Sequence, residues 1–132
     1  MKFLLDTDIC IYLIKKNPPS VLERLQACHA GDVGVSAITV AELRYGADKS
    51  QHPKRNHDGL DLFFAPLEIT AFDDRAATEY GAIRAQLEST GQPIGPLDLL
   101  IAAHAKSLGV TLVTNNSAEF RRVRGLKVEN WT

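Results

Sequence analysis

Short apolar runs alternate with longer segments of helical spacing along this 132-residue sequence. The apolar runs lie at residues 3–5, 33–35, 67–69 and 110–113. Brief, mostly apolar runs of this kind are typical of strands that are buried on both faces. Because a parallel neighbour needs a long crossover connection, strands that alternate with helices favour parallel pairing. The pattern predicts an α/β fold, a three-layer α/β/α sandwich around a mostly parallel central sheet of four to five short strands.

Helical segments are expected in the intervals between these runs. Apolar side chains recur at helical spacing in residues 9–14, 20–31, 36–47, 73–91 and 95–109. Gly91 and Gly109 lie where two of these helices should end, because glycine readily adopts the left-handed backbone of a helix terminus. We expect the polar stretch 50–57 to form a loop or a helix break around Pro53, and residues 127–129 to add an edge strand.

The composition is that of one ordinary globular domain. Hydrophobic residues make up 45% and charged residues 23% of the chain, and no repeat, low-complexity tract or linker divides it. We therefore expect residues 1–132 to form a single domain. The formal net charge of −1 provides no overall attraction to nucleic acid, so any contact with RNA must come from local basic patches.

The cysteines and the amino terminus indicate the compartment. Cys10 and Cys28 have no CxxC spacing and lie in apolar surroundings, which predicts buried free thiols rather than a disulfide or a metal site. The apolar run after Met1 is too short for a signal peptide, and no segment approaches the roughly 18 apolar residues that span a membrane. We expect a cytoplasmic protein with no membrane association.

Three carboxylates interrupt apolar stretches near the expected strand ends. Asp6 closes the run 3–5, Glu42 breaks the run Val40-Ala41-Glu42-Leu43, and Asp98 lies in the apolar start of segment 95–109. If the sheet is parallel, the carboxyl ends of its strands meet at one edge, and all three acids can converge on one cleft. Converging carboxylates raise one another's pKa unless a cation neutralises them. The structural alternative is that Asp98 only caps its helix and Glu42 only pairs with an arginine.

The ligand types favour a hard divalent cation. Oxygen ligands without a His or Cys cluster favour Mg²⁺ or Mn²⁺ over zinc. Such a site can activate water and stabilise the charge on a phosphodiester. The histidines have no metal-site spacing, and His104, which is six residues after Asp98, should point elsewhere on a helix and serve in packing or hydrogen bonding.

Ordered motifs along the chain carry a resemblance to a known family. They are Leu4-Leu5-Asp6-Thr7, Ser36-x-x-Thr39-x-x-Glu42-Leu43, Gly95-Pro96-x-Asp98-x-x-Ile101-Ala102 and Leu112-Val113-Thr114-Asn115-Asn116 with Phe120. From residue 3 to Trp131 the chain resembles the PIN-domain ribonucleases. More narrowly it resembles the VapC toxins of bacterial type II toxin–antitoxin pairs, including the subgroup that cuts initiator tRNA in its anticodon loop.

The resemblance implies a PIN-like nuclease domain that hydrolyses a phosphodiester in RNA and thereby inhibits translation. It makes Asp6, Glu42 and Asp98 the catalytic acids, with Asp6 and Asp98 as ligands of Mg²⁺ or Mn²⁺. Further candidates for metal binding or for orienting its ligands are Glu42, Thr7, Thr114, Asn116 and Glu119. Many PIN domains place a fourth acid just after the last core strand, whereas Thr114 is followed here by two asparagines. Glu119 is either a substitute for that acid or a surface charge.

Macromolecular partners follow from the same resemblance. It implies a VapB-like antitoxin, a homodimer, an RNA substrate such as tRNA, and contact with promoter DNA only through the antitoxin. Basic residues follow two of the motifs, as Arg44, Lys49, Lys54 and Arg55, and as Arg121, Arg122, Arg124 and Lys127. We expect Arg121 or Arg122 to bind the RNA backbone, since a negative metal site needs flanking positive charge to hold phosphate.

Two other functions remain open at the level of sequence. Asp6-Thr7-Asp8 is also similar to the DxD motif of the haloacid-dehalogenase phosphatases, which would make the chain a small metal-dependent phosphatase that uses Asp6 and Asp8. Cys10 stands where that family has a threonine, so Asp8 is better explained as part of the first helical turn. The chain can also be a non-catalytic module that binds an antitoxin.

Overall fold

The computed structural model describes residues 1–132 and contains one five-stranded parallel sheet. Its strands are β1 (Phe3–Leu5), β2 (Val33–Ser36), β3 (Glu68–Thr70), β4 (Thr111–Val113) and β5 (Val128–Glu129). They lie in the order β3-β2-β1-β4-β5, and every neighbouring pair is parallel. The predicted α/β fold and the predicted edge strand near the carboxyl terminus are confirmed.

Helices cover both faces of this sheet. They are α1 (Thr7–Lys15), α2 (Pro19–Gln26), α3 (Ala37–Asp48), α4 (Pro53–Phe64), α5 (Asp74–Ser89), α6 (Pro96–Leu108) and α7 (Ser117–Phe120). Successive strand residues point to opposite faces, so Leu5 packs into a core with α1 to α4, and Leu4 packs into a second core with α5 to α7. The three layers predicted from sequence are therefore present. None of the helices is both long and apolar enough to cross a bilayer.

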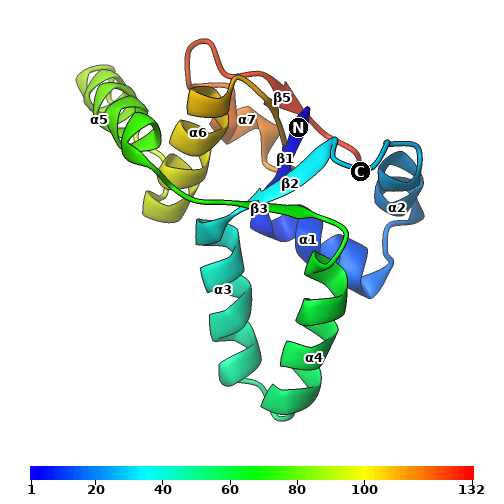
Figure 1. The fold of residues 1–132 in the computed structure, drawn as a ribbon. Coiled ribbons are helices and arrows are strands. Elements are labelled where there is room, and N and C mark those ends of the chain that lie inside the picture. The colour runs from blue at the N-terminus through cyan, green and yellow to red at the C-terminus, as the bar shows by residue number, and fades with distance from the viewer.

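The expected helix break around Pro53 is present between α3 and α4, whereas a loop that continues to residue 57 is wrong. Helix α4 begins at Pro53, because proline fits the first turn of a helix, where its missing N–H removes no hydrogen bond. Leu60 and Phe64 are the buried side chains of α4. Helices α3 and α4 form a hairpin that projects from the body of the molecule (Figure 1).

Two smaller expectations also differ from the structure. Helix α2 ends at Gln26 instead of continuing to Gly31, and the short helix α7 was not expected. Both cysteines are free thiols as predicted, but only Cys10 is buried, whereas Cys28 is partly exposed. Cys28 follows the end of α2 and packs against the margin of the core that contains Cys10, which leaves it partly exposed.

The order of the strands creates a crevice between β1 and β4. From the central β1 the chain moves outward to β2 and β3, and it then returns to the other side of β1 with β4 and β5. In open parallel sheets, ligands bind outside the carboxyl ends of the strands at the point where the direction of winding reverses. Asp6 directly follows β1 and Thr114 directly follows β4, so these two residues flank that point.

Candidate active site at the carboxyl edge of the sheet

Asp6 is buried at the end of β1, with 4% of its surface exposed. Its Oδ1 accepts a hydrogen bond from the backbone N–H of Ile9 at 3.0 Å, which makes Asp6 the N-cap of α1. Its Oδ2 accepts a hydrogen bond from the hydroxyl of Thr114. The backbone N–H of Asp6 donates to the carbonyl of Val113 at 3.0 Å, so both main chain and side chain tie Asp6 to the end of β4.

Burial raises the pKa of Asp6 to about 6. The hydrogen bonds from Thr114 and Ile9 act in the opposite direction, whereas the charges of Asp8 and Asp98 raise the pKa further. A buried carboxylate with like charges nearby is stabilised in its ionised form by a cation. The surroundings of Asp6 are therefore electrostatically suited to cation binding.

Asp98 lies in the first turn of α6 and is partly buried. Gly95 is the N-cap of this helix and no side chain bonds to the helix end, so the structure does not support the alternative in which Asp98 is only a cap. Burial is the largest cause that raises the pKa of Asp98 to about 6, followed by the charges of Glu119 and Glu42. The charge of Asp8 and a hydrogen bond with Glu119 raise it further.

Glu42 lies in the middle of α3 and contacts the start of α1. Its Oε1 accepts a hydrogen bond from the hydroxyl of Thr7 at 2.8 Å, and that hydroxyl is also 3.3 Å from Oγ1 of Thr39. No arginine pairs with Glu42, because the nearby Arg44 bonds to Asp61 at 2.6 Å. The alternative in which Glu42 serves only as an arginine partner is therefore wrong.

Glu119 and Asn116 extend the site from the end of β4 toward α6. The backbone N–H of Asn116 donates to Oγ1 of Thr114 at 2.9 Å, and its side-chain amide donates to Glu119 at 2.6 Å. The other carboxylate oxygen of Glu119 accepts from the backbone N–H of Gly95 at 3.1 Å. Glu119 thus lies beside the turn that carries Asp98, instead of being an isolated surface charge.

The donor chemistry of this edge fits a hard divalent cation. The charges of Asp8 and Asp98 act on Asp6, and those of Glu119, Glu42 and Asp8 act on Asp98. No three His, Cys, Asp or Glu side chains stand close enough to form a closed metal-binding group. Mg²⁺ commonly uses only one or two carboxylates, with water and substrate phosphate completing its shell, so an open arrangement of oxygen donors suits it.

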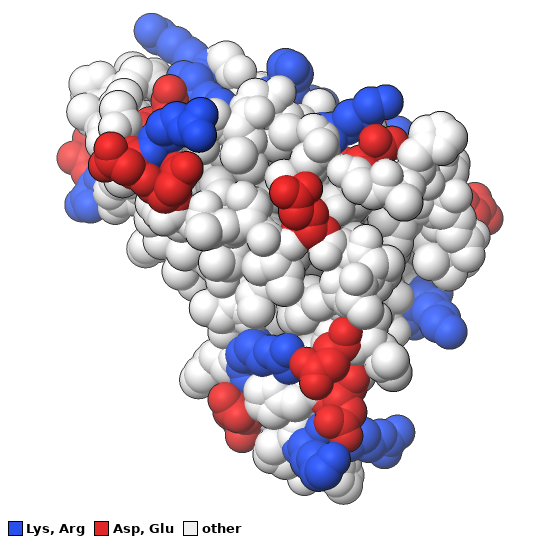
Figure 2. Space-filling view, in the orientation of Figure 1, with Lys and Arg blue, Asp and Glu red and all other residues white.

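A groove of about 750 Å³ extends from the acidic edge between α1 and the α3–α4 hairpin. Thr7, Asp8 and Glu42 form part of its wall. The basic side chains that line it are Lys15, Lys49 and Arg55. On the face shown in Figure 2, basic and acidic side chains are interspersed over the hairpin and do not form a patch of one sign.

The two basic groups noted in the sequence have different surroundings. Arg44 and Lys54 form ion pairs within the hairpin, Arg44 with Asp61 at 2.6 Å and Lys54 with Asp58 at 2.9 Å. Arg122 donates to the carbonyl of Pro93 at 3.3 Å, and Arg121 is exposed at the end of α7. Arg122 therefore lies against the segment that leads into α6, a few residues before Asp98.

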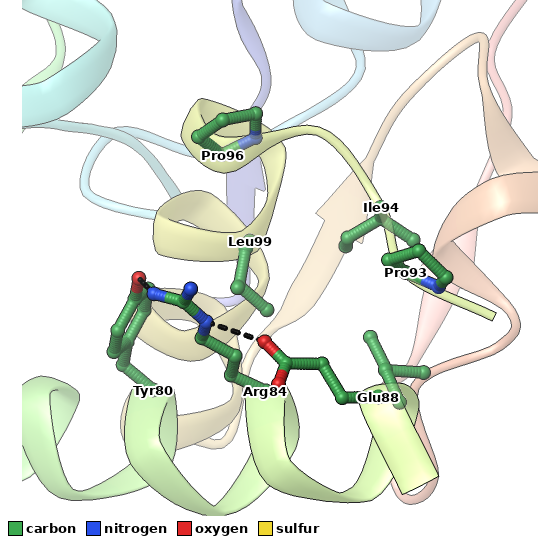
Figure 3. A pocket seen from close by; sticks show the side chains of 8 residues that line it. Tyr80, Arg84, Glu88, Pro93, Ile94, Pro96 and Leu99 are labelled. Atoms are coloured by element: carbon green, nitrogen blue, oxygen red, sulfur yellow. Dashed lines mark hydrogen bonds and ion pairs between the residues drawn. The ribbon is translucent and has the colours of Figure 1, made fainter. Parts of the chain in front are cut away.

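A second cavity, of about 300 Å³, lies between α5 and the segment that leads into α6 (Figure 3). Arg84 donates to Glu88 at 2.8 Å and to the hydroxyl of Tyr80 at 3.0 Å across its wall. Leu99 lines this cavity, but the preceding residue, Asp98, does not. None of the acids of the candidate site lines this cavity, so it is separate from that site.

The fold and this acidic edge define a class of protein. A family model described as "PIN domain" matches residues 3–126, and the chain therefore belongs to the PIN-domain family. PIN-domain nucleases generally depend on a divalent metal. The fold and the family expected from the ordered motifs are confirmed.

Comparisons with individual proteins narrow the class. The "tRNA(fMet)-specific endonuclease VapC" of Shigella flexneri is 47% identical over 132 residues, which cover 100% of this chain and 99% of that protein. The "Ribonuclease VapC2" of Rickettsia felis is 43% identical over 132 residues, with 99% and 98% covered. Within the PIN-domain family, the chain groups with the VapC ribonucleases.

Solved structures agree with this grouping. DNA-bound VapBC from Salmonella typhimurium matches with a TM-score of 0.94 at 43% identity, covering 100% of this chain and 99% of that chain. VapBC2 from Rickettsia felis, bound to a DNA fragment from its promoter, matches with a TM-score of 0.93 at 42% identity, covering 100% of both chains.

Proposed function

We propose that the chain is the toxin of a toxin–antitoxin pair, a Mg²⁺-dependent endoribonuclease that hydrolyses a phosphodiester in the anticodon loop of initiator tRNA and thereby inhibits translation. The observation that carries this proposal is the pair of acids Asp6 and Asp98, each with a pKa of about 6, at the crevice between β1 and β4. Relatives named as tRNA(fMet)-specific endonucleases support the choice of substrate. A tRNA substrate places this activity in the cytoplasm.

The residues of the acidic edge have distinct parts in this proposal. Asp6 and Asp98 hold the cation, which when bound supplies a more acidic water and neutralises charge on the phosphodiester. Thr114 orients Asp6 through its hydroxyl hydrogen bond, and Thr7 orients Glu42 in the same way. Mn²⁺ can replace Mg²⁺ because both prefer oxygen ligands.

Asn116 and Glu119 support the same site from α7. Glu119 bonds to Asn116 and to the backbone of Gly95, which places its negative charge next to Asp98. In this position it supplies the acid that many PIN domains carry directly after the last core strand. A charge there increases the attraction of the edge for a divalent cation.

Basic side chains beside the acidic edge bind the RNA backbone in this proposal. Arg121 is exposed and Arg122 lies against the segment before α6. Lys15, Lys49 and Arg55 line the groove that begins at Glu42. Positive charges on two sides of an acidic centre can hold the phosphates that flank the one attacked.

A VapB-like antitoxin is the proposed protein partner. The similar solved structures are described as VapBC assemblies, two of them bound to DNA. By analogy, this chain forms a homodimer and reaches promoter DNA only through the antitoxin. The groove of about 750 Å³ beside the acidic edge offers a surface where a partner would also block access to Glu42.

The proposed reaction is tested with purified protein and initiator tRNA, with Mg²⁺ or with EDTA. We expect site-specific cleavage by the wild type in Mg²⁺, no cleavage in EDTA, and a loss of at least about a hundredfold in Asp98→Asn. Asp74→Asn is the matched control, because Asp74 is an exposed acid in the first turn of another helix. Cleavage that survives both EDTA and Asp98→Asn contradicts the proposed chemistry.

The two alternative functions have their own measurements. A phosphatase that uses Asp6 and Asp8 would form an acid-stable phosphoaspartate when incubated with a small phosphate ester, whereas we expect none. A non-catalytic module would not arrest growth on expression, whereas we expect arrest with the wild type and normal growth with Asp6→Ala. Normal growth on expression of the wild type would favour the non-catalytic alternative, and arrest that persists in Asp6→Ala would contradict a role of Asp6 in the toxic activity.

A further inference from the structure

His104 is a buried polar residue that the proposed reaction does not use. It lies on α6, and only 1% of its surface is exposed. Its Nδ1 is 2.8 Å from Oγ of Ser36. Ser36 is the N-cap of α3, and its Oγ accepts a hydrogen bond from the backbone N–H of Ile38 at 3.0 Å. A side chain of α6 therefore holds the residue that starts α3.

The other side of the imidazole faces β3. Nε2 of His104 lies 3.5 Å from Oγ1 of Thr70, and the ring of Phe72 packs edge-on at 5.5 Å. Burial lowers the pKa of His104. The charge of Asp73 and a hydrogen bond with the backbone of Ala71 raise it, but their effects are smaller. The ring is thus neutral at pH 7, so one of its nitrogens donates a hydrogen bond and the other accepts one.

This contact joins the two helices that carry acids of the candidate site. His104 is six residues after Asp98 on α6, and Glu42 is six residues after Ser36 at the start of α3. Counting Ser36 as part of α3, the hydrogen bond between His104 and Ser36 is the only side-chain hydrogen bond between α6 and α3. A buried hydrogen bond of this kind limits how far the two helices can shift relative to each other.

We propose that His104 is a positioning residue: its hydrogen bond to Ser36 fixes the separation of Asp98 and Glu42, and through it the affinity of the acidic edge for a divalent cation. The inference rests on the proposed function, because it treats Asp98 and Glu42 as parts of one site. Groups that hydrogen-bond directly to metal ligands typically contribute about 10- to 100-fold in metal affinity or activity. His104 acts through Ser36 and the two helices, so we expect an effect at the lower end of that range.

Four variants separate positioning from simple packing. His104→Asn places an amide near the original position of Nδ1 and keeps a partner for Ser36. His104→Gln places its amide near Nε2 and keeps only the contact toward Thr70. His104→Leu fills the space without a hydrogen bond, and Thr70→Val removes the hydroxyl that faces Nε2 while leaving the contact with Ser36.

The first measurement is Mn²⁺ affinity, by electron paramagnetic resonance on the intact protein, together with the melting temperature. We expect His104→Gln and His104→Leu to bind Mn²⁺ about tenfold more weakly, and His104→Asn and Thr70→Val to remain within about twofold of the wild type. If His104→Leu does not fold, the comparison of Asn with Gln still decides the matter. Equal affinities in these two variants, or affinities that follow only the melting temperatures, would overturn the proposal.

The second measurement is the kinetics of tRNA cleavage. We expect the kcat of His104→Gln at fixed Mg²⁺ to fall about tenfold with an unchanged KM for tRNA, and His104→Asn to restore it. If the wild type binds Mn²⁺ but cleaves no tRNA, the proposed function is contradicted. The Mn²⁺ affinities of the variants would then still test the positioning role of His104. If cleavage depends on Asp98 but kcat is the same in all His104 variants, the proposed role of His104 would be overturned while the proposed function stands.

Discussion

Thr7 donates a hydrogen bond from its hydroxyl to Oε1 of Glu42 at 2.8 Å, which joins the first turn of α1 to the middle of α3. Asp6, the preceding residue, is the N-cap of α1 and is bonded to the end of β4 through Thr114. The consecutive residues Asp6 and Thr7 therefore bond to two different elements: Asp6 to the end of β4 and Thr7 to α3. The start of α1 sets the position of Asp6 and of Glu42 together.

Replacing Thr7 by valine should weaken catalysis more than folding. Valine keeps the shape of the side chain but leaves Glu42 without its donor, so we expect kcat/KM for tRNA to fall about tenfold, the equivalent of one lost hydrogen bond. Thr7→Ser keeps the hydroxyl and should stay within about threefold of the wild type. Steady-state cleavage assays compare the two variants, and equal activity in both would show that the contact with Glu42 has no part in the reaction.

Replacing Thr114 by valine should shift the acid side of the pH–rate profile to higher pH. The hydrogen bond from Thr114 lowers the pKa of Asp6, so its loss raises that pKa further above about 6. Protons then compete better with the cation for Asp6, and we expect activity at pH 6 to fall roughly fivefold more than at pH 8. Thr114→Ser retains the donor, and its profile should match that of the wild type.

Removing the charge of Asp98 should stabilise the metal-free protein at neutral pH. Because the pKa of Asp98 is raised from 3.8 to about 6 in the folded state, folding holds its proton more tightly than the unfolded chain does. The stability that this group contributes is fully present below pH 3.8 and is lost as the pH rises through about 6. Asp98→Asn keeps a neutral side chain at every pH. Its free energy of unfolding therefore exceeds that of the wild type only where the wild-type carboxyl is ionised.

We expect Asp98→Asn to raise the free energy of unfolding by about 1–2 kcal/mol at pH 8 in EDTA, after screening by solvent at a partly exposed group. The gain should vanish near pH 4. Urea denaturation at the two pH values measures it, and Asp74→Asn provides the control for the loss of one exposed charge. A variant that is less stable than the wild type at pH 8 would contradict the electrostatic account of this edge.

Divalent cations should stabilise the wild type in a pH-dependent way. A ligand that binds only the folded state at a hundred times its Kd adds about 2.7 kcal/mol. Binding requires Asp6 and Asp98 to be ionised, and both have a pKa of about 6, so the rise in Tm with Mn²⁺ should be large at pH 7.5 and small at pH 5. Differential scanning fluorimetry detects it. A shift of equal size in Asp98→Asn would indicate binding elsewhere.

Gly34 in β2 should not tolerate a larger residue. A Cβ at this position would lie 2.6 Å from Sδ of Met1 and 2.8 Å from the backbone oxygen of Glu68. The β2–β3 pairing would have to shift, so we expect Gly34→Ala to lower stability by about 1–3 kcal/mol. Gly81→Ala is the matched control: it lies in α5 with open space around its Cβ and should gain about 0.5–1 kcal/mol. Chemical denaturation of both variants checks the opposite signs.

Local patterns along the chain were sufficient to predict the sheet and the position of Asp6. The apolar runs and their helical intervals predict parallel strands, and a carboxylate directly after β1 must lie at their carboxyl edge. Helix α4 (Pro53–Phe64) was not predicted, because its polar first turn has no apolar repeat to indicate a helix. The short α7 is fixed by tertiary packing of Phe120 and not by any periodic pattern.

Side-chain contacts between distant segments were beyond the reach of these patterns. The bond of Glu119 to the backbone of Gly95 joins residues 24 positions apart, and that of His104 to Ser36 joins residues 68 positions apart. A signal for His104 existed, since a polar residue in the midst of Ile101-Ala102-Ala103-His104-Ala105 needs a buried partner. The identity of that partner depends on the packing of α6 against the start of α3.

Because β1 lies at the centre of the sheet, the crevice between β1 and β4 forms only after most of the chain has been made. Asp6 and Thr114 are 108 residues apart, and β1 completes its pairing only when β4 has joined it. Contacts between such distant segments form slowly, since the entropy of closing a long loop must be overcome first. During synthesis, a nascent chain carries Asp6 from the outset but has no crevice until residues 111–113 are available. The assembled acidic edge is therefore a late product of folding, and a truncated chain that ends before β4 lacks it.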